Sequence, residues 1–100
     1  MPTPFQQRVY DIISQIPEGS ISTYGAIARA MNTKAYQAVG QALNKNPFAP
    51  KVPCHRIVDS DGALGGFASG AKAKIAILKE EGISVEDNQI IDFKKKLHKF

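Results

Sequence analysis

The sequence predicts a small α+β domain that is mainly helical, with a helix-turn-helix and a short β-hairpin in a winged-helix-like arrangement. Three observations point to this fold class. Apolar residues recur at helical spacing near the N-terminus, two short helical segments meet across a tight break, and apolar pairs flank a turn in the second half. A chain of 100 residues suits one domain. We expect residues 1–100 to form a single domain with no N-terminal domain before it, ending in a basic tail at about residues 94–100.

The first helix is expected over about residues 5–16. Its apolar side chains lie at the spacing of one helical face, and Pro17 stops the helix because proline lacks the N–H that a helix needs. Residues 17–19 contain a proline and a glycine, which is typical of a turn. The apolar face consists of Phe5, Val9, Ile12, Ile13 and Ile16.

Two short helices are expected next. Ser22 or Thr23 is suited to cap a helix that ends near residue 31, and Thr33 is suited to cap a second one that ends near residue 44. The break between them is tight, so the pair fits a helix-turn-helix, although an ordinary helical hairpin has the same pattern. Small residues on the second helix would permit the close approach of another surface: Ala35, Ala38, Gly40 and Ala42.

The second half of the chain predicts shorter elements. Residues 59–62 form a turn signal between Ile57-Val58 and Ala63-Leu64, which together predict a small hairpin. A helix is expected over about residues 71–81, stopped by Gly82 and burying Ile75, Ile77 or Leu78. Beyond Ser84 the pattern weakens. We expect Ile90, Ile91 and Phe93 to pair with another segment and the basic end to fray.

Positive charge is concentrated in two parts of the chain, whose net charge is +4. Basic residues outnumber acidic ones six to two up to Val58, acidic residues prevail seven to three from Asp59 to Phe93, and four lysines follow. The first half is therefore the expected face for a polyanion. A solvated surface explains the final lysines equally well. They are Lys94, Lys95, Lys96 and Lys99.

Composition also excludes several classes of protein. One cysteine cannot form an internal disulfide, which favours a reducing interior, and it excludes a cysteine-based zinc site within this chain. No apolar run approaches the roughly 20 residues that span a membrane. The first residues lack the basic-then-apolar order of a signal peptide. We expect a protein without metal or cofactor, not bound to a membrane, and located in the cytoplasm (at the nucleoid in a prokaryote, or in the nucleus of a eukaryote).

The only cysteine, Cys54, lies between a proline and a histidine, with Arg56 two positions on. A thiolate is the reactive form of cysteine, and a neighbouring histidine, directly or through water, makes it easier to form. Free cysteines are more often small buried residues, and neighbours on a strand point to opposite faces. Adjacency to His55 alone therefore leaves a buried structural cysteine as the simpler interpretation.

The run Pro53-Cys54-His55-Arg56-Ile57-Val58 resembles the active-site motif of the O6-alkylguanine-DNA alkyltransferases, which repair DNA by accepting an alkyl group on a cysteine. The resemblance extends from about Phe5 to Ile83. Other blocks match in order and spacing: Ser22-Thr23-Tyr24-Gly25, Gln37-Ala38-Val39-Gly40, Asn46-Pro47, Gly65-Gly66-Phe67 and Leu78-Lys79-Glu80-Glu81-Gly82. The resemblance implies a DNA-repair transferase that reacts once and acts, as a monomer, on double-stranded DNA containing O6-alkylguanine.

The resemblance also implies roles for individual residues. Cys54 would be the nucleophile, His55 would take its proton through a water, and Glu81 would orient His55. Asn46 would brace the turn before the cysteine, and Tyr24 would donate to the purine and press on the phosphate of the flipped nucleotide. Without the resemblance, a lone glutamate is usually a surface acid, an Asn-Pro pair is usually a simple turn, and a lone tyrosine is usually part of the core.

The same resemblance implies a pocket and a DNA-binding surface. The carbonyl of Val52 would read a guanine edge, and Phe67, Ala68 and Ser69 would line the alkyl pocket. The DNA-binding residues would be Tyr24, Thr33, Lys34, Ala35, Gln37, Ala38, Gly40 and Arg56. Two positions depart from the family pattern. Gln37 stands where an arginine usually enters the base stack, and Phe67 stands where many members have tyrosine.

Two other functions fit parts of the pattern. An alkyltransferase-like binding protein would sense alkylated bases and recruit other repair factors without transfer, but such proteins replace the reactive cysteine, often with tryptophan. A helix-turn-helix regulator with a buried cysteine would leave His55, Asn46 and Glu81 unexplained at their spacing. The presence of Cys54 therefore favours alkyl transfer.

Overall fold

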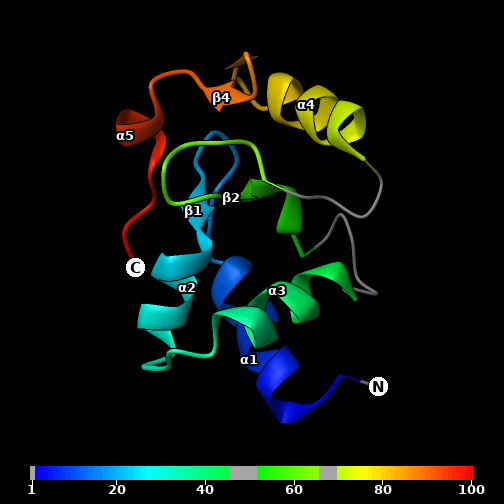
Figure 1. Cartoon of the computed structure of the whole chain (residues 1–100), viewed down its shortest axis with the longest axis vertical. Helices are drawn as coiled ribbons and strands as arrows, with labels where there is room; N and C mark the ends of the chain where they lie inside the picture. Colours follow the sequence, from blue (N-terminus) through cyan, green and yellow to red (C-terminus); the bar gives the residue numbers. More distant parts are fainter. Residues whose placement is uncertain (1, 46–51, 66–69) are drawn as a thin grey trace.

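A computed structural model of the chain describes residues 2–45, 52–65 and 70–100. Three helices, α1 (Pro4–Ile13), α2 (Tyr24–Ala30) and α3 (Tyr36–Asn44), pack together at one end of the molecule. The other end holds α4 (Ala71–Glu80), the strands β3 (Val85–Glu86) and β4 (Gln89–Ile90), and the short helix α5 (Phe93–Lys96). The strands β1 (Ser22–Thr23) and β2 (Ile57–Val58) lie between them (Figure 1). The mixed, mainly helical fold class predicted from the sequence is confirmed.

The first two helices begin as the sequence predicts. Thr3 caps α1 in a reciprocal capping box with Gln6. The helix ends at Ile13 with Ser14 as its C-cap, three residues earlier than the predicted end at residue 16. The side chain of Thr23 accepts a hydrogen bond of 3.1 Å from the N–H of Ala26 and so caps α2. Because Thr23 is also the last residue of β1, the cap fixes α2 directly to the central sheet.

Helix α3 begins later than predicted. Thr33 does not cap it. Its side chain instead accepts a hydrogen bond of 3.1 Å from the N–H of Ala35 within the turn. The helix starts at Tyr36, and it packs against both α1 and α2. The α2–turn–α3 unit thus forms the predicted helix-turn-helix, with the second helix starting two residues later than expected.

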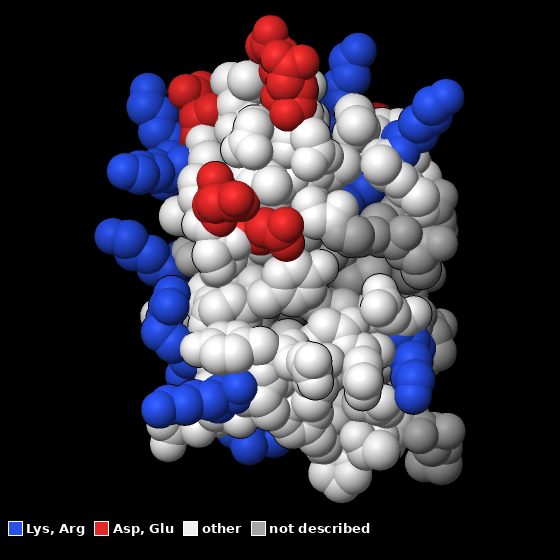
Figure 2. Space-filling view, in the orientation of Figure 1, with Lys and Arg blue, Asp and Glu red and all other residues white. Residues whose placement is uncertain are grey.

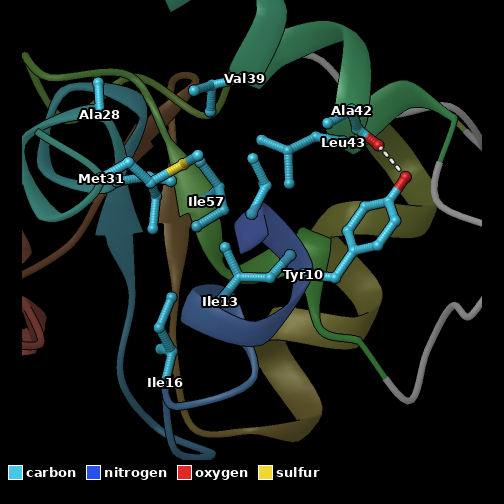
Figure 3. Packing of buried hydrophobic residues seen from close by; sticks show 11 residues of the cluster. Tyr10, Ile13, Ile16, Ala28, Met31, Val39, Ala42, Leu43 and Ile57 are labelled. Carbon is cyan, nitrogen blue, oxygen red and sulfur yellow. Dashed lines mark hydrogen bonds between the residues drawn. The ribbon is translucent and has the colours of Figure 1, made fainter. Parts of the chain in front are cut away.

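The central strands separate two hydrophobic clusters. β1 and β2 run parallel, with Ser22 opposite Ile57 and Thr23 opposite Val58. Ile57 belongs to the cluster of the three N-terminal helices, whereas Val58 belongs to the cluster under α4, because successive strand residues face opposite sides. Figure 3 shows the first cluster, where the buried hydroxyl of Tyr10 donates to the carbonyl of Ala42 at 2.7 Å.

The predicted hairpin at residues 57–64 is wrong in its pairing, although the chain does reverse there. The N–H of Asp59 donates to the carbonyl of Ala63 at 3.0 Å, but β2 pairs with β1, and Ala63 bridges to Gln89. A hairpin lies instead at β3–β4, where Val85 pairs with Ile90. The parallel partner of β2 comes from far upstream, which local turn residues could not reveal.

Helix α4 ends in a Schellman motif. Gly82 has a φ of +85°, the N–H of Ile83 donates to the carbonyl of Leu78, and the N–H of Gly82 donates to that of Lys79. Ile83 and Leu78 also share the second hydrophobic cluster. The predicted stop at Gly82 is confirmed, and it leaves Glu81 as the C-cap residue.

The prediction that the basic C-terminal end frays is wrong. After α5, Leu97 forms a parallel bridge with Ile21, and two backbone hydrogen bonds hold it there. The N–H of Ile21 donates to the carbonyl of Lys96 at 2.9 Å, and the N–H of His98 donates to the carbonyl of Ile21 at 2.7 Å. The basic tail is therefore fixed beside β1.

Candidate active site

Cys54 lies on a tight double turn rather than on a strand. The N–H of Cys54 donates to the carbonyl of Val52 at 2.9 Å around Pro53, whose φ of −83° and ψ of 66° are those of an inverse γ-turn. A single 3₁₀ turn, Cys54–Arg56, follows and leads into β2. Proline fixes the φ angle that this turn requires, so the sequence itself sets the position of the cysteine. Cys54 is half-buried against the first hydrophobic cluster.

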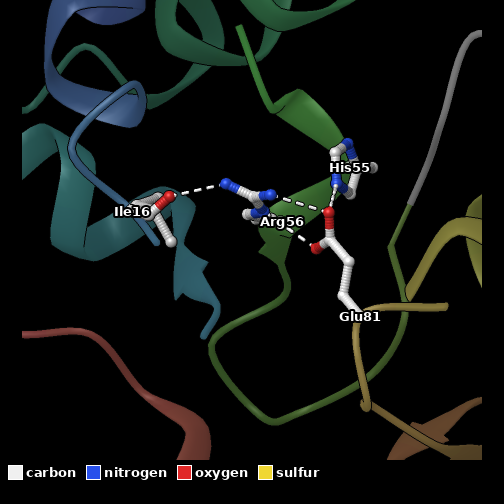
Figure 4. A network of polar contacts seen from close by, with 4 residues as sticks. All are labelled: Ile16, His55, Arg56 and Glu81. Carbon is white, nitrogen blue, oxygen red and sulfur yellow. Dashed lines mark hydrogen bonds and ion pairs between the residues drawn. The ribbon is translucent and has the colours of Figure 1, made fainter. Parts of the chain in front are cut away.

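His55, Arg56 and Glu81 form one polar network (Figure 4). The Nε2 atom of His55 lies 3.0 Å from Oε2 of Glu81, and His55 is 3% exposed. Arg56 donates to both carboxylate oxygens of Glu81, from Nε at 2.8 Å and from Nη2 at 2.7 Å. Its Nη1 donates to the carbonyl of Ile16 at 2.7 Å. The network joins the cysteine turn to the end of α4 and to the segment after α1.

The network favours an ionised Glu81. Burial opposes ionisation, but the hydrogen bonds from Arg56 and His55 outweigh it and lower the pKa of the Glu81 carboxyl below its usual value. The same contact raises the pKa of the Arg56 guanidinium, chiefly through its hydrogen bond to Glu81. An ionised carboxylate can only accept hydrogen bonds, so Nε2 of His55 carries the hydrogen that it donates to Glu81.

Lys74 is a buried residue of this region that the sequence analysis did not single out. Its ammonium donates to the carbonyls of Ile57 and Leu64, both at 2.6 Å. Burial lowers its pKa to about 8, partly opposed by the negative charges of Asp59 and of a Cys54 thiolate. Lys74, Leu78 and Glu81 have the spacing of one helical face. Because two of the three are charged, the apolar pattern of the sequence does not indicate this face.

Tyr24 and Val52 lie beside the cysteine turn. Tyr24 is the first residue of α2, and both side chains pack against the first hydrophobic cluster with Cys54. Burial, then the charges of Asp59 and of a Cys54 thiolate, raises the pKa of Tyr24. Its hydroxyl therefore remains protonated and able to donate near neutral pH. The carbonyl of Val52 accepts the turn hydrogen bond from Cys54.

The residues predicted to bind DNA separate into two groups. Most lie on one face of the turn and α3, where Lys34, Ala35 and Gln37 are exposed, and Thr33, Ala38 and Gly40 are partly exposed. A methyl group added at Gly40 would meet no atom of the described structure within 4 Å, so the small residue faces open space. Arg56 does not join this face, because its guanidinium is occupied by Glu81 and Ile16. The predicted site residues Asn46, Phe67, Ala68 and Ser69 lie outside the described residues.

The described ranges contain neither a cluster of metal ligands nor a membrane-spanning helix. No group of three or more His, Cys, Asp and Glu side chains among residues 2–45, 52–65 and 70–100 is placed to hold a metal ion. No helix in those ranges is long and apolar enough to cross a membrane.

Comparisons with known proteins agree with the arrangement. Residues 4–83 match the family model of the 6-O-methylguanine DNA methyltransferase DNA-binding domain. A methylated-DNA–protein-cysteine methyltransferase of Methanothermobacter thermautotrophicus is 44% identical over 84 residues, which are 84% of this chain and 47% of that protein. The chain spans about half the length of the curated relatives that it matches first.

Two solved structures share the fold. Mycobacterium tuberculosis OGT in complex with DNA has a TM-score of 0.79 and 41% identity, covering 82% of this chain and 51% of that one. S. pombe Atl1, bound to damaged DNA containing O6-carboxymethylguanine, has a TM-score of 0.82 and 30% identity, and covers both chains completely. The second similarity includes the C-terminal segment that the family model leaves out.

Proposed function

The chain belongs to the 6-O-methylguanine DNA methyltransferase family, and from this premise we propose that it repairs DNA by transferring an alkyl group from O6-alkylguanine to Cys54. The observation that carries the proposal is the pairing of His55 with Glu81 next to the only cysteine. A surface acid at the end of a helix has no structural need for a buried histidine partner. The pairing orients a base beside a thiol, which is what an activated nucleophile requires.

His55 acts as the base through its second ring nitrogen. Glu81 accepts the hydrogen of Nε2, so neutral His55 presents the lone pair of Nδ1. That nitrogen takes the thiol proton through one water molecule. Arg56 is a positioning residue, since its two hydrogen bonds keep the Glu81 carboxylate ionised and in place. Losing Arg56 would free Glu81 to rotate away from His55.

The transfer is a single displacement. The Cys54 thiolate attacks the alkyl carbon, a carbon–sulfur bond forms, and the bond from that carbon to O6 breaks. The electron pair of the broken bond moves into the guanine ring, and the base takes up one proton, for which the protonated hydroxyl of Tyr24 is the donor. His55 returns the thiol proton through the same water network to Tyr24. Cys54 is left alkylated, so each molecule reacts once.

The face of α3 that carries Gln37 and Gly40 is proposed to lie against the DNA duplex. The helix after the turn is the one that reads DNA in helix-turn-helix proteins, and the exposed face here has no covering element in the part of the chain that is described. The alkylated base must leave the stack to reach Cys54, which costs a few kcal/mol. Gln37 is shorter than arginine and uncharged, so it fills the vacated stack less well.

Incubation with a duplex that contains one O6-methylguanine tests the proposal. We expect the peptide with Cys54 to gain the mass of one methyl group in place of a hydrogen. Cys54→Ser should bind the duplex as wild type does and gain nothing. Binding by the wild-type protein without a mass gain would instead support the alternative, a damage-sensing protein without transfer. A methyl group on another residue would contradict the assignment of Cys54.

A further inference from the structure

The C-terminal segment takes no part in the proposed transfer step, yet it is held against the helix-turn-helix. Two hydrogen bonds on either side of Leu97 join it to Ile21, which directly precedes β1. β1 in turn leads into the cap of α2. The side chains of residues 98–100 therefore have a defined place next to α2.

Two open hollows meet at Arg29 of α2. His98, Lys99 and Phe100 line the first together with Ala26, Arg29 and Ala30. Arg29 also lines the second, together with Asn32, Thr33, Lys34 and Tyr36 of the turn and α3. The C-terminal end and the start of the DNA-facing helix thus share one exposed cation between them. They form a continuous surface rather than two separate ones.

This surface is positively charged. Arg29, Lys34, Lys94, Lys95 and Lys99 are all exposed. Figure 2 shows basic side chains along the edge of the molecule where Figure 1 places α5, the C-terminal end and α2. Acidic side chains lie beside the upper part of this edge, at the end with β4 and near the middle of this face. An edge with this charge attracts a polyanion. Because the edge is continuous with the face of α3, the polyanion that fits both is the one that α3 binds.

We propose that residues 94–100 form a second phosphate-contacting surface for the same duplex that α3 engages, joined to the helix-turn-helix through Arg29. This inference rests on the proposed function for its partner, double-stranded DNA. Lysine carries a point charge on a flexible stem, which suits sequence-independent contacts to phosphates. The segment thus adds affinity for any duplex and holds the protein in register while a base is extruded.

The salt dependence of binding to an undamaged duplex tests the inference. Each phosphate contact adds about 0.9 to the slope of log K against log salt concentration. The double variant Lys95→Gln/Lys99→Gln should therefore lower the magnitude of the slope by about 2. The matched control is Lys72→Gln/Lys79→Gln on α4, which removes the same charge from exposed positions of a helix outside the proposed surface. Its slope should equal that of wild type.

An equal loss of slope in the two double variants would overturn the inference, because the slope would then depend on the net charge of the protein and not on the position of the lysines. An unchanged slope in the C-terminal variant would also overturn it. Lys34→Gln serves as the reference for the helix-turn-helix. If Lys34→Gln lowers the slope and the C-terminal variant does not, only this inference fails. If the wild-type protein does not bind the duplex, the proposed function fails with it. Unfolding midpoints of all variants establish that each is folded.

Discussion

Around α1–α3, the core consists of apolar side chains with one buried hydroxyl, that of Tyr10, whereas around α4 two charged side chains, Lys74 and Glu81, complete the packing. Both charged residues reach from α4 to the segment that carries Cys54. Lys74 binds the carbonyl of Ile57, and Glu81 binds His55 and Arg56. The backbone positions of Lys74 and Glu81 are separated by a rise of about 10 Å along the helix axis.

The two kinds of packing, apolar around α1–α3 and charged around α4, fit the different roles proposed for the two regions. Apolar packing is sufficient to hold the helices that carry the proposed DNA-binding face. The cysteine turn is too short to bury much apolar surface, so its geometry depends on directional hydrogen bonds from charged groups. Such contacts position a nucleophile more closely than dispersion contacts do, but they make this end of the molecule sensitive to pH.

Replacing Glu81 should have the largest effect on stability. Glu81→Gln leaves Arg56 and His55 without their anionic acceptor, and we expect the free energy of unfolding to fall by about 3 kcal/mol at neutral pH. Because the pKa of Glu81 is lowered on folding, its contribution is present above 4.5 and is lost as the pH falls through the folded value. The exposed neighbour provides the control, since Glu80→Gln should change stability by less than about 0.5 kcal/mol. Equal effects in denaturant titrations would show that the network does not hold the turn.

Lys74 should give the next largest effect, with a pH dependence of the same sign but at alkaline rather than acidic pH. Its pKa falls from 10.5 to about 8 on folding, so between these values the unfolded chain binds more protons and stability rises with pH. The free energy of unfolding of wild type relative to Lys74→Met should rise by roughly 2–3 kcal/mol across this range. The comparison cancels the tyrosines, whose raised pKa values lower stability above pH 10. A flat difference would mean that folding does not lower the pKa of Lys74, so that the amine stays protonated across this range in the folded protein.

Tyr10→Phe is the matching change at the α1–α3 end. It removes the buried hydrogen bond to Ala42, and we expect a loss of about 1 kcal/mol. Thermal or denaturant unfolding should give the same loss at pH 5 and pH 8, because no group in this contact titrates there. If the loss of unfolding free energy differed between pH 5 and pH 8, the α1–α3 end would be as sensitive to pH as the α4 end, which would contradict the comparison.

Sequence periodicity predicted the α1–α3 end better than the α4 end for the same physical reason. Apolar residues such as Val9, Ile13 and Ile27 repeat locally and reveal a helix. The inner face of α4 did not show this pattern, because Lys74 and Glu81 occupy buried positions. The partner of β2 and the attachment of Leu97 to Ile21 depend on contacts between distant segments, which no local pattern contains. The pairing of His55 with Glu81 was implied only by family resemblance.

Gly40→Ala should have the smallest effect on stability and sharpens the account of α3. The added methyl group meets open space, and alanine is the better helix former, so the protein should gain up to about 1 kcal/mol. Binding to duplex DNA should nevertheless weaken several-fold, because the methyl group projects into the proposed interface. Fluorescence anisotropy with a labelled duplex measures the change. Unchanged affinity would mean that this face does not approach the DNA.

We propose that α3 engages the DNA and that the charged network at the end of α4 positions the thiol. The most direct measurement compares two rates, transfer from O6-methylguanine in a duplex and transfer from free O6-benzylguanine, which requires no base extrusion. Gln37→Arg adds a planar cation at the base stack, so it should accelerate the first rate and leave the second unchanged. Glu81→Gln, measured where it is still folded, should slow both rates by the same factor. Equal acceleration of both rates by Gln37→Arg, or slowing of the duplex reaction alone by Glu81→Gln, would contradict the division.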